Sequence, residues 1–178
     1  TIPQSHIGQP GYLGVLDTSV VTVASLLQDS GYNTYVAGKW HLGQEPHNLP
    51  PARGFQRSLI QADSGSDNWE MRPYLLLKPD VAWFKEGEPL HELPEDFYSS
   101  TFFVDTAIAQ IAADRDSGKP FFSYVAFQAN HIPVQAPEHF IENNRGKYDK
   151  GWHEIRQARR AEAIYRGLLP EDTAMTET

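Results

Sequence analysis

Residues 31–43 read GYNTYVAGKWHLG, in which glycines flank a short run of β-forming residues. The stretch NTYVAG predicts a β-strand, because it is rich in residues that favour extended backbone. The residues that follow, KWHLGQEPHNLPPARGF, are rich in glycine, proline and asparagine and predict a loop. Lys39 and His41 therefore stand directly after the end of the predicted strand.

A helix is predicted before this strand, over DTSVVTVASLLQDSGYN. Thr18 or Ser19 can accept a hydrogen bond from the first turn and so begin the helix. Gly31 suits the left-handed position that follows the last turn. The apolar residues that fall on one face of this helix are Val23, Leu26 and Leu27.

The same order of elements recurs later in the chain. Residues 97–118, FYSSTFFVDTAIAQIAADRDSG, predict a helix that begins near Ser99 or Ser100 and ends at Gly118. The run FFSYVAFQ is almost entirely apolar and has the length of a buried strand. The loop ANHIPVQAP follows it and carries His131. The apolar stripe of the helix consists of Phe103, Ala107, Ile108 and Ile111.

Helix, buried strand and polar loop thus occur twice, which predicts an α/β layered fold with a mainly parallel sheet. In such folds ligands bind beyond the carboxyl ends of the strands. Lys39 and His41 follow the first strand and His131 follows the second. We therefore expect these three side chains to lie at the same edge of the sheet.

The other segments carry weaker signals. Residues 54–97 are predicted to be irregular, apart from a hairpin over VAWFKEGEPL that turns near Glu86 and Gly87. Pro137 can open a short helix, PEHFIEN, and GWHEIRQARRAEAIYRGLL predicts a further helix.

Composition limits the class of protein. The 178 residues suit one domain, and 40% hydrophobic with 21% charged residues is a globular composition. The net charge of −8 argues against a nucleic-acid binder, although a local cationic pocket can still bind a small anion. No cysteine is present, which excludes disulfides, thiolate metal sites and a cysteine nucleophile within this stretch. The apolar runs are far shorter than the ~20 residues of a membrane span.

Lys39, His41 and His131 are the candidate site residues. A lysine offers a compact charge for a sulfate or phosphate oxygen, and a histidine can hold or pass a proton near neutral pH. In extended geometry positions 39 and 41 point the same way, while Trp40 packs oppositely. On spacing alone, an exposed lysine and a structural histidine are the favoured interpretation of Lys39 and His41, whereas a structural role for His131 is equally open. The histidines interpreted as surface or packing residues are His6, His47, His91, His139 and His153.

Three other kinds of site are not supported. A phosphate-binding P-loop needs a glycine where Asn33 stands and a serine or threonine where Trp40 stands. The stretch 63–68, DSGSDN, lacks the spacing of a calcium loop and is interpreted as a polar turn, so we assign no metal ligand. No G-x-S-x-G motif accompanies a serine–histidine–acid triad.

The run ending in GKWHLG resembles the second signature of the type I sulfatases. Three further segments resemble the same family, in family order, and the last of them resembles a segment of bacterial arylsulfatases. They are LPEDFYSSTFFVDTAI, PFFSYVAFQANHIPVQAP and GKYDKGWHEIRQARRAEAIYRGLLP. The resemblance implies an alkaline-phosphatase-like α/β fold and hydrolysis of sulfate esters, with a formylglycine nucleophile and a calcium ion.

The resemblance also implies a role for each candidate. Lys39 resembles the lysine that bridges the formylglycine and a sulfate oxygen. His41 resembles the histidine that contacts the formylglycine and helps to eliminate sulfate from it. His131 resembles the histidine that binds sulfate near the leaving oxygen. Cations at these places would stabilise charge that develops on the transferred group.

The chain departs from the family pattern in what it lacks. It has no C/S-x-P-S-R motif, from which formylglycine is made, and the acidic calcium ligands of the family are not found. Residues 1–178 are therefore expected to be a central part of one catalytic domain, inactive alone, with calcium and formylglycine supplied from outside the chain. The alternatives are a phosphonate or phosphate monoester hydrolase of the same superfamily and a non-catalytic sulfatase-like binding domain.

The expected partner is a small-molecule or glycan sulfate ester, with no nucleic acid and no membrane span. The compartment is left between periplasm, exterior and cytoplasm, with the first two slightly favoured. The identity of the ester and the oligomeric state cannot be read from the chain.

Overall fold

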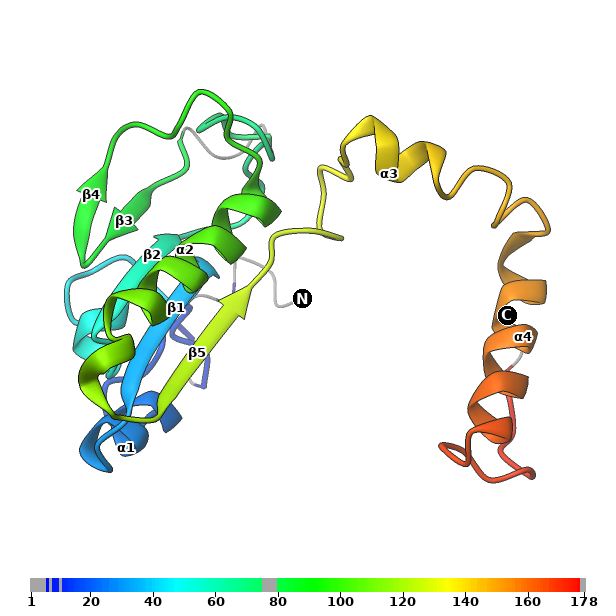
Figure 1. The fold of residues 1–178 in the computed structure, drawn as a ribbon, viewed down its shortest axis with the longest axis horizontal. Coiled ribbons are helices and arrows are strands. Elements are labelled where there is room, and N and C mark those ends of the chain that lie inside the picture. Colours follow the sequence, from blue (N-terminus) through cyan, green and yellow to red (C-terminus); the bar gives the residue numbers. More distant parts are fainter. Residues whose placement is uncertain (1–5, 7, 10, 75–79, 177–178) are drawn as a thin grey trace. The chain divides into compact units, whose positions relative to one another are not determined.

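The computed structural model describes residues 6, 8–9, 11–74 and 80–176. It divides into two compact units, residues 1–135 and 136–178. The first unit holds a five-stranded sheet in the order β4-β3-β2-β1-β5 (Figure 1). The strands are β1 (Asn33–Lys39), β2 (Arg57–Gln61), β3 (Trp83–Lys85), β4 (Glu88–Leu90) and β5 (Phe121–Ala126).

The centre of this sheet is parallel. Strand β1 pairs in parallel with β2 on one side and with β5 on the other. Strands β3 and β4 extend the sheet beyond β2 as antiparallel neighbours. The predicted α/β class with parallel strands at its centre is therefore confirmed, as are the first strand, the β5 strand and the hairpin. The predicted burial of the β5 strand is wrong: it pairs on one side only, at the edge of the sheet, and none of its residues is buried. Glu86 and Gly87 form the hairpin turn with φ of +53° and +86°.

Strand β2 lies inside the stretch 54–97 that was predicted to be irregular, and that prediction is wrong for residues 57–61. Only Leu59 and Ile60 are apolar in this strand, so its sequence carries little periodic signal. Its burial comes from its place beside β1, where four of its five residues are buried. Tertiary context thus decides the strand more than local propensity does.

Helix α1 (Val23–Asp29) begins later than predicted. Thr22, not Thr18 or Ser19, is the N-cap, and its Oγ1 accepts a hydrogen bond from the Ser25 amide at 3.0 Å. The buried Arg53 guanidinium donates to the carbonyls of Asp17 and Val20, and holds residues 17–21 out of the helix. Gly31 takes the predicted left-handed conformation, with φ of +89°.

The predicted apolar face of this first helix is also wrong. Ala24 is its buried residue, whereas Val23 and Leu26 are 59% and 57% exposed. Leu27 is half-buried and lies three residues after Ala24, so the side of the helix that faces the sheet runs through Ala24 and Leu27 instead of Val23 and Leu26.

Helix α2 (Ser99–Ala113) begins at a predicted serine, but Tyr98 is its N-cap and no side chain caps it. Phe103 and Ala107 are buried as predicted, while Ile108 is exposed. The helix ends at Ala113, and a short 3-10 helix, η3 (Arg115–Ser117), connects it to Gly118. Between β1 and β2 lies a second 3-10 helix, η2 (Pro50–Arg53).

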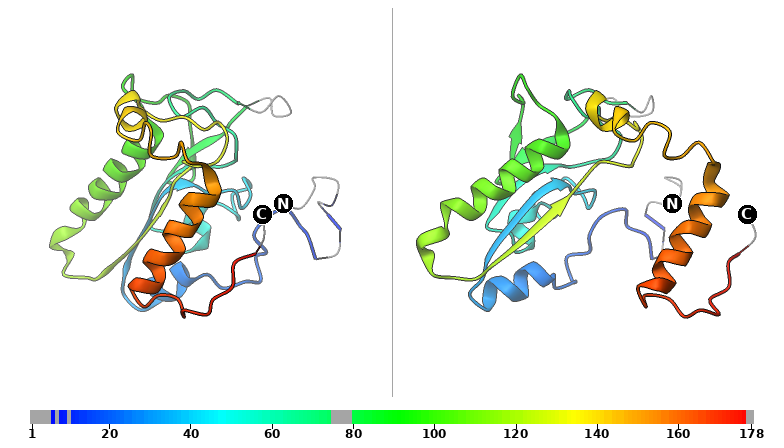
Figure 2. Two further views of the ribbon diagram at one scale, coloured as in Figure 1. Left: turned by 90° about the vertical axis from the view of Figure 1, so that its right-hand side faces the viewer. Right: turned by 45° about the vertical axis from the view of Figure 1, so that its right-hand side comes forward.

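The two helices cover opposite faces of the sheet (Figure 2). On the α1 face, a core forms around Ala24, Val36, Trp40, Phe55 and Ile60. On the α2 face, the core contains Ala37, Leu59, Trp83, Phe103 and Ala107. Burial of this apolar surface on both sides of β1 is the main stabilising contribution to the first unit.

An ion pair ties the end of α2 to the edge of the sheet opposite the candidate residues. Arg57 contacts both carboxylate oxygens of Asp114 at 2.8 Å, and the Tyr35 hydroxyl donates to the same group at 2.9 Å. These bonds lower the pKa of Asp114 from 3.8 to about 2. Because the folded pKa lies below the ordinary one, the pair stabilises the fold above about pH 4. That stabilisation is lost as the pH falls through about 2.

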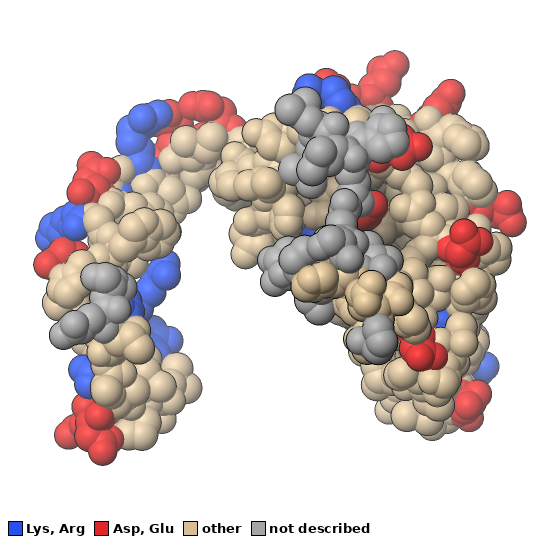
Figure 3. Space-filling view, turned by 180° about the vertical axis from the view of Figure 1, so that it is seen from behind, with Lys and Arg blue, Asp and Glu red and all other residues tan. Residues whose placement is uncertain are grey.

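The second unit contains α3 (Glu138–Glu142) and α4 (Gly151–Tyr165). Arg156 and Arg160 of α4 donate to the backbone carbonyls of Thr176 and Thr173, which holds residues 173–176 along the helix. Lysine, arginine and acidic side chains alternate over this unit, so that it shows no basic stripe on the face in view (Figure 3). Among the described residues, no helix is long and apolar enough to cross a membrane.

Candidate active site

Lys39 is the last residue of β1, and its side chain is half-buried. Its Nζ donates a hydrogen bond to the Ser64 hydroxyl at 3.0 Å. Ser64 follows β2, the strand beside β1, so neighbouring carboxyl ends of parallel strands bring the two residues together. The ammonium is thereby aimed along the edge of the sheet where ligands of α/β folds bind.

His131 follows β5 and reaches the same hydroxyl from the other side of β1. Its Nε2 lies 3.2 Å from Ser64 Oγ, and its Nδ1 lies 2.8 Å from the Ile132 carbonyl oxygen. The carbonyl can only accept, so Nδ1 carries a proton and donates to it. Nε2 faces the serine hydroxyl, whose oxygen accepts from Lys39. The expectation that Lys39 and His131 lie at the same edge of the sheet is confirmed.

His41 reaches this edge by a different backbone path from the one we predicted. Strand β1 ends at Lys39, and His41 has a φ of +54°, so positions 39 and 41 are not both extended. Its Nε2 lies 3.4 Å from the Asp63 carboxylate, next to the residue that Lys39 and His131 contact. The Ser64 amide donates to the same carboxylate oxygen at 2.8 Å. His41 therefore lies next to Lys39, Ser64 and His131 through its contact with Asp63, and its side chain does not run parallel to that of Lys39 as predicted.

Asp63 and Ser64 are the site residues that sequence reasoning missed, because the stretch 63–68 was interpreted as an ordinary polar turn. They stand directly after the unrecognised strand β2, just as Lys39 follows β1 and His131 follows β5. A correct assignment of that strand would have pointed to them by the same argument. The five other histidines are all exposed, which confirms their interpretation as surface residues.

The tryptophan and the two glycines of GKWHLG, which flank Lys39 and His41, have packing roles. Trp40 packs on the α1 face, opposite Lys39 as predicted, and its Nε1 donates to the Asn48 carbonyl at 3.0 Å. Gly38 has a φ of +126° and faces the backbone of Ala126 in β5. A Cβ atom at position 43 would lie 2.7 Å from the Asn48 side chain. The glycines of GKWHLG are thus needed for close packing, not for a phosphate loop.

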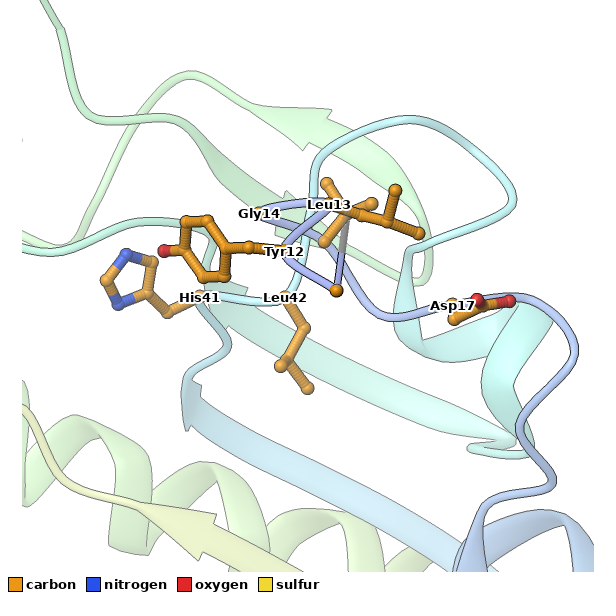
Figure 4. A pocket seen from close by; sticks show the side chains of 8 residues that line it. Tyr12, Leu13, Gly14, Asp17, His41 and Leu42 are labelled. Atoms are coloured by element: carbon orange, nitrogen blue, oxygen red, sulfur yellow. The ribbon is translucent and has the colours of Figure 1, made fainter. Parts of the chain in front are cut away.

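A cavity of about 560 Å³ opens beside His41 (Figure 4). Residues 11–17 form one wall, and His41 with Leu42 forms the other. The Leu16 amide donates to the Leu42 carbonyl at 2.9 Å, which fixes the two walls to each other. The cavity gives His41, whose side chain is 58% exposed, an open space on the side away from the core.

The described residues do not form a metal site: no group of three or more histidine, aspartate or glutamate side chains among them could hold an ion. The carboxylate that contacts a candidate residue is Asp63, which lies beside His41 and accepts from the Ser64 amide. A calcium ion prefers several clustered oxygen ligands, so this donor set does not fit it.

Comparison with known proteins gives this arrangement its family. The family model described as Sulfatase matches residues 2–175. The arylsulfatase of Klebsiella aerogenes is 34% identical over 173 residues, which cover 96% of this chain and 37% of the relative. An uncharacterized sulfatase of Schizosaccharomyces pombe is 34% identical over 171 residues, covering 93% of this chain and 31% of the relative.

The fold is shared with solved structures as well. The crystal structure of Ps i-CgsB in complex with k-i-k-neocarrahexaose superimposes with a TM-score of 0.62 at 22% identity. The match covers 72% of this chain and 30% of that protein. The candidate residues thus belong to an α/β protein that places a cation and two imidazoles at the carboxyl edge of its parallel strands. The chain belongs to the sulfatase family, and it spans about a third of the length of the curated relatives.

Proposed function

We propose that the chain supplies sulfate-binding and acid–base residues to the hydrolysis of sulfate esters. The observation that carries this proposal is the convergence of Lys39 and His131 on one hydroxyl, with His41 beside it. A tetrahedral sulfate group placed over Ser64 would find a permanent cation and a proton donor within reach. Membership of the sulfatase family supports the choice of sulfate.

The residues have separable tasks in this proposal. Lys39 binds a sulfate oxygen and offsets the negative charge that grows on the transferred group as the ester bond breaks. His131, whose Nδ1 keeps its proton in the bond to the Ile132 carbonyl, takes up a second proton from solvent on Nε2 once substrate displaces the serine hydroxyl, and gives that proton to the departing ester oxygen. The bond from its Nδ1 to the Ile132 carbonyl orients the ring for this transfer. Asp63 orients the ring of His41 through its contact with Nε2. In this position His41 can exchange a proton with the reacting groups from the side of the site opposite His131.

We also propose that residues 1–178 are the central part of one catalytic domain of a longer protein. The coverage of 31% and 37% of two relatives supports this assignment. The formylglycine and calcium implied by the family resemblance would then come from other parts of that protein, and this chain alone would not turn over substrate. An aryl sulfate is the substrate to test first, since one relative is named an arylsulfatase.

Sulfate and phosphate groups have the same shape. Hydrolysis of a sulfate ester and a phosphate ester with the same leaving group therefore tests whether sulfate is the preferred group. The full-length protein should hydrolyse 4-nitrophenyl sulfate with a kcat/KM at least roughly 10²-fold above that for 4-nitrophenyl phosphate. Faster hydrolysis of the phosphate ester would contradict the proposal and favour a phosphate or phosphonate monoester hydrolase. Binding of the sulfate ester without turnover would favour a non-catalytic sulfatase-like domain.

A further inference from the structure

The loop that carries His131 is held at its beginning, middle and end by one other loop, residues 64–68. At its beginning, the buried Gln128 amide donates to the Ser66 carbonyl at 2.6 Å, and the His131 amide donates to the Gln128 carbonyl at 3.1 Å. In its middle, the His131 ring contacts Ser64. The position of the imidazole therefore depends on how firmly these two loops are joined.

Gln135 joins the end of the loop through both atoms of its side-chain amide. Its Oε1 accepts hydrogen bonds from the backbone amide and the side-chain amide of Asn68, at 3.0 and 3.1 Å. Its Nε2 donates to the Asp67 carboxylate at 3.0 Å. A single side chain thus makes three hydrogen bonds to two consecutive residues of the facing loop.

Asn68 connects this contact to the core of the unit. It is 1% exposed, and its Nδ2 also lies 3.4 Å from the carbonyl of Pro133, two residues after His131. Its Oδ1 accepts from the Ser99 hydroxyl at 2.5 Å, and its carbonyl accepts from the Ser99 amide at 2.9 Å. The first turn of α2 therefore anchors Asn68, and Asn68 anchors the histidine loop.

We propose that Gln135 and Asn68 form a polar clamp that positions His131 against Ser64 for the reaction. They are positioning residues, because their hydrogen bonds join the two loops and none of these bonds is made to Ser64, Lys39 or the His131 ring. The expected effect on the reaction rate rests on the proposed function, whereas the hydrogen bonds of the clamp are present in the structure whatever the reaction is. Displacement of a catalytic group by about 1 Å can cost roughly 10²-fold in rate.

The test replaces Gln135 by leucine, which keeps the volume of the side chain and removes its three hydrogen bonds. In the full-length protein, kcat for 4-nitrophenyl sulfate should fall roughly 10- to 100-fold while KM changes less than about threefold. Val134→Ala is the matched control, since Val134 is the adjacent residue and is 82% exposed; its kcat should stay within about twofold.

A double-mutant cycle separates positioning from a general loss of structure. If Gln135 acts through His131, Gln135→Leu should cost less than about threefold in a His131→Ala background. An equal loss in both backgrounds would overturn the proposal. Should the leucine variant fail to fold, Gln135→Glu keeps the acceptor oxygens for Asn68 and loses the donor to Asp67, and its kcat should fall between those of wild type and His131→Ala.

A readout without turnover keeps the clamp distinct from the proposed function. Gln135→Leu should shift the ring NMR resonances of His131 and leave those of the exposed His91 unchanged. Unchanged His131 resonances would contradict the clamp even in an active enzyme. Shifted His131 resonances in a protein that does not hydrolyse sulfate esters would support the clamp and contradict the proposed function.

Discussion

Replacing Lys39 by alanine in the full-length protein should lower kcat/KM for 4-nitrophenyl sulfate by roughly 10²–10³-fold. The ammonium is a permanent cation that donates to the Ser64 hydroxyl, which His131 also contacts. Without the ammonium, the negative charge that develops on the transferred sulfate group is no longer offset by the positive charge of Lys39. A preorganised charge in a half-buried site is worth more than the same charge in water, because the protein has already oriented it.

Lys85→Ala is the matched control for this variant. Lys85 lies in β3 of the same sheet but is exposed, and we expect its removal to leave kcat/KM within about twofold. Lys39→Arg keeps the charge and loses the compact ammonium geometry, so it should recover only part of the activity. Undiminished kcat/KM in Lys39→Ala would remove Lys39 from the mechanism.

The second large effect is expected on stability, from Gly38→Ala. A Cβ atom at position 38 would lie 2.0 Å from the carbonyl oxygen of Ala126 and 2.7 Å from its carbon. Both contacts are to the backbone of β5, which cannot move away without losing its pairing with β1. The φ of +126° adds strain for any residue with a side chain. Together these effects should cost roughly 3 kcal/mol or more.

Gly31→Ala provides the control for this substitution. Gly31 also has a positive φ, +89°, but no atom would lie within 4 Å of its added Cβ. It should therefore cost only the backbone strain, roughly 1–2 kcal/mol. Thermal unfolding of both variants measures the difference, with Gly38→Ala lowering the midpoint by at least twice as much. Equal midpoints would show that β5 yields to the added methyl group.

The strands that were predicted correctly are those with a strong local β-signal, although only β1 is buried as expected, since β5 lies at the edge of the sheet and has no buried residue. The run NTYVAG and the run FFSYVAFQ are rich in β-formers, and both became parallel strands. The turn at Glu86 and Gly87 follows from its glycine. Strand β2 was missed because its two apolar residues are too few for a periodic pattern, and its burial comes from neighbours distant in sequence.

The candidate site was also predicted only in part, and the residues that were found are those that follow a recognised strand. Lys39 and His131 were grouped correctly because each follows a recognised strand. Ser64 and Asp63 were missed because the strand before them was missed. The conformation of His41 could not be predicted either, since a positive φ at a histidine has no local sequence signal and depends on its contacts with the facing loop.

Binding of inorganic sulfate tests the central claim most directly, because it requires neither turnover nor the nucleophile. Sulfate is titrated into the full-length protein while the ring NMR resonances of its histidines are followed. We predict saturable shifts at His131, weakened or lost in Lys39→Ala, and no comparable shift at the exposed His91. Sulfate binding that leaves His131 unchanged, or that is as strong in Lys39→Ala as in the wild type, would contradict the account.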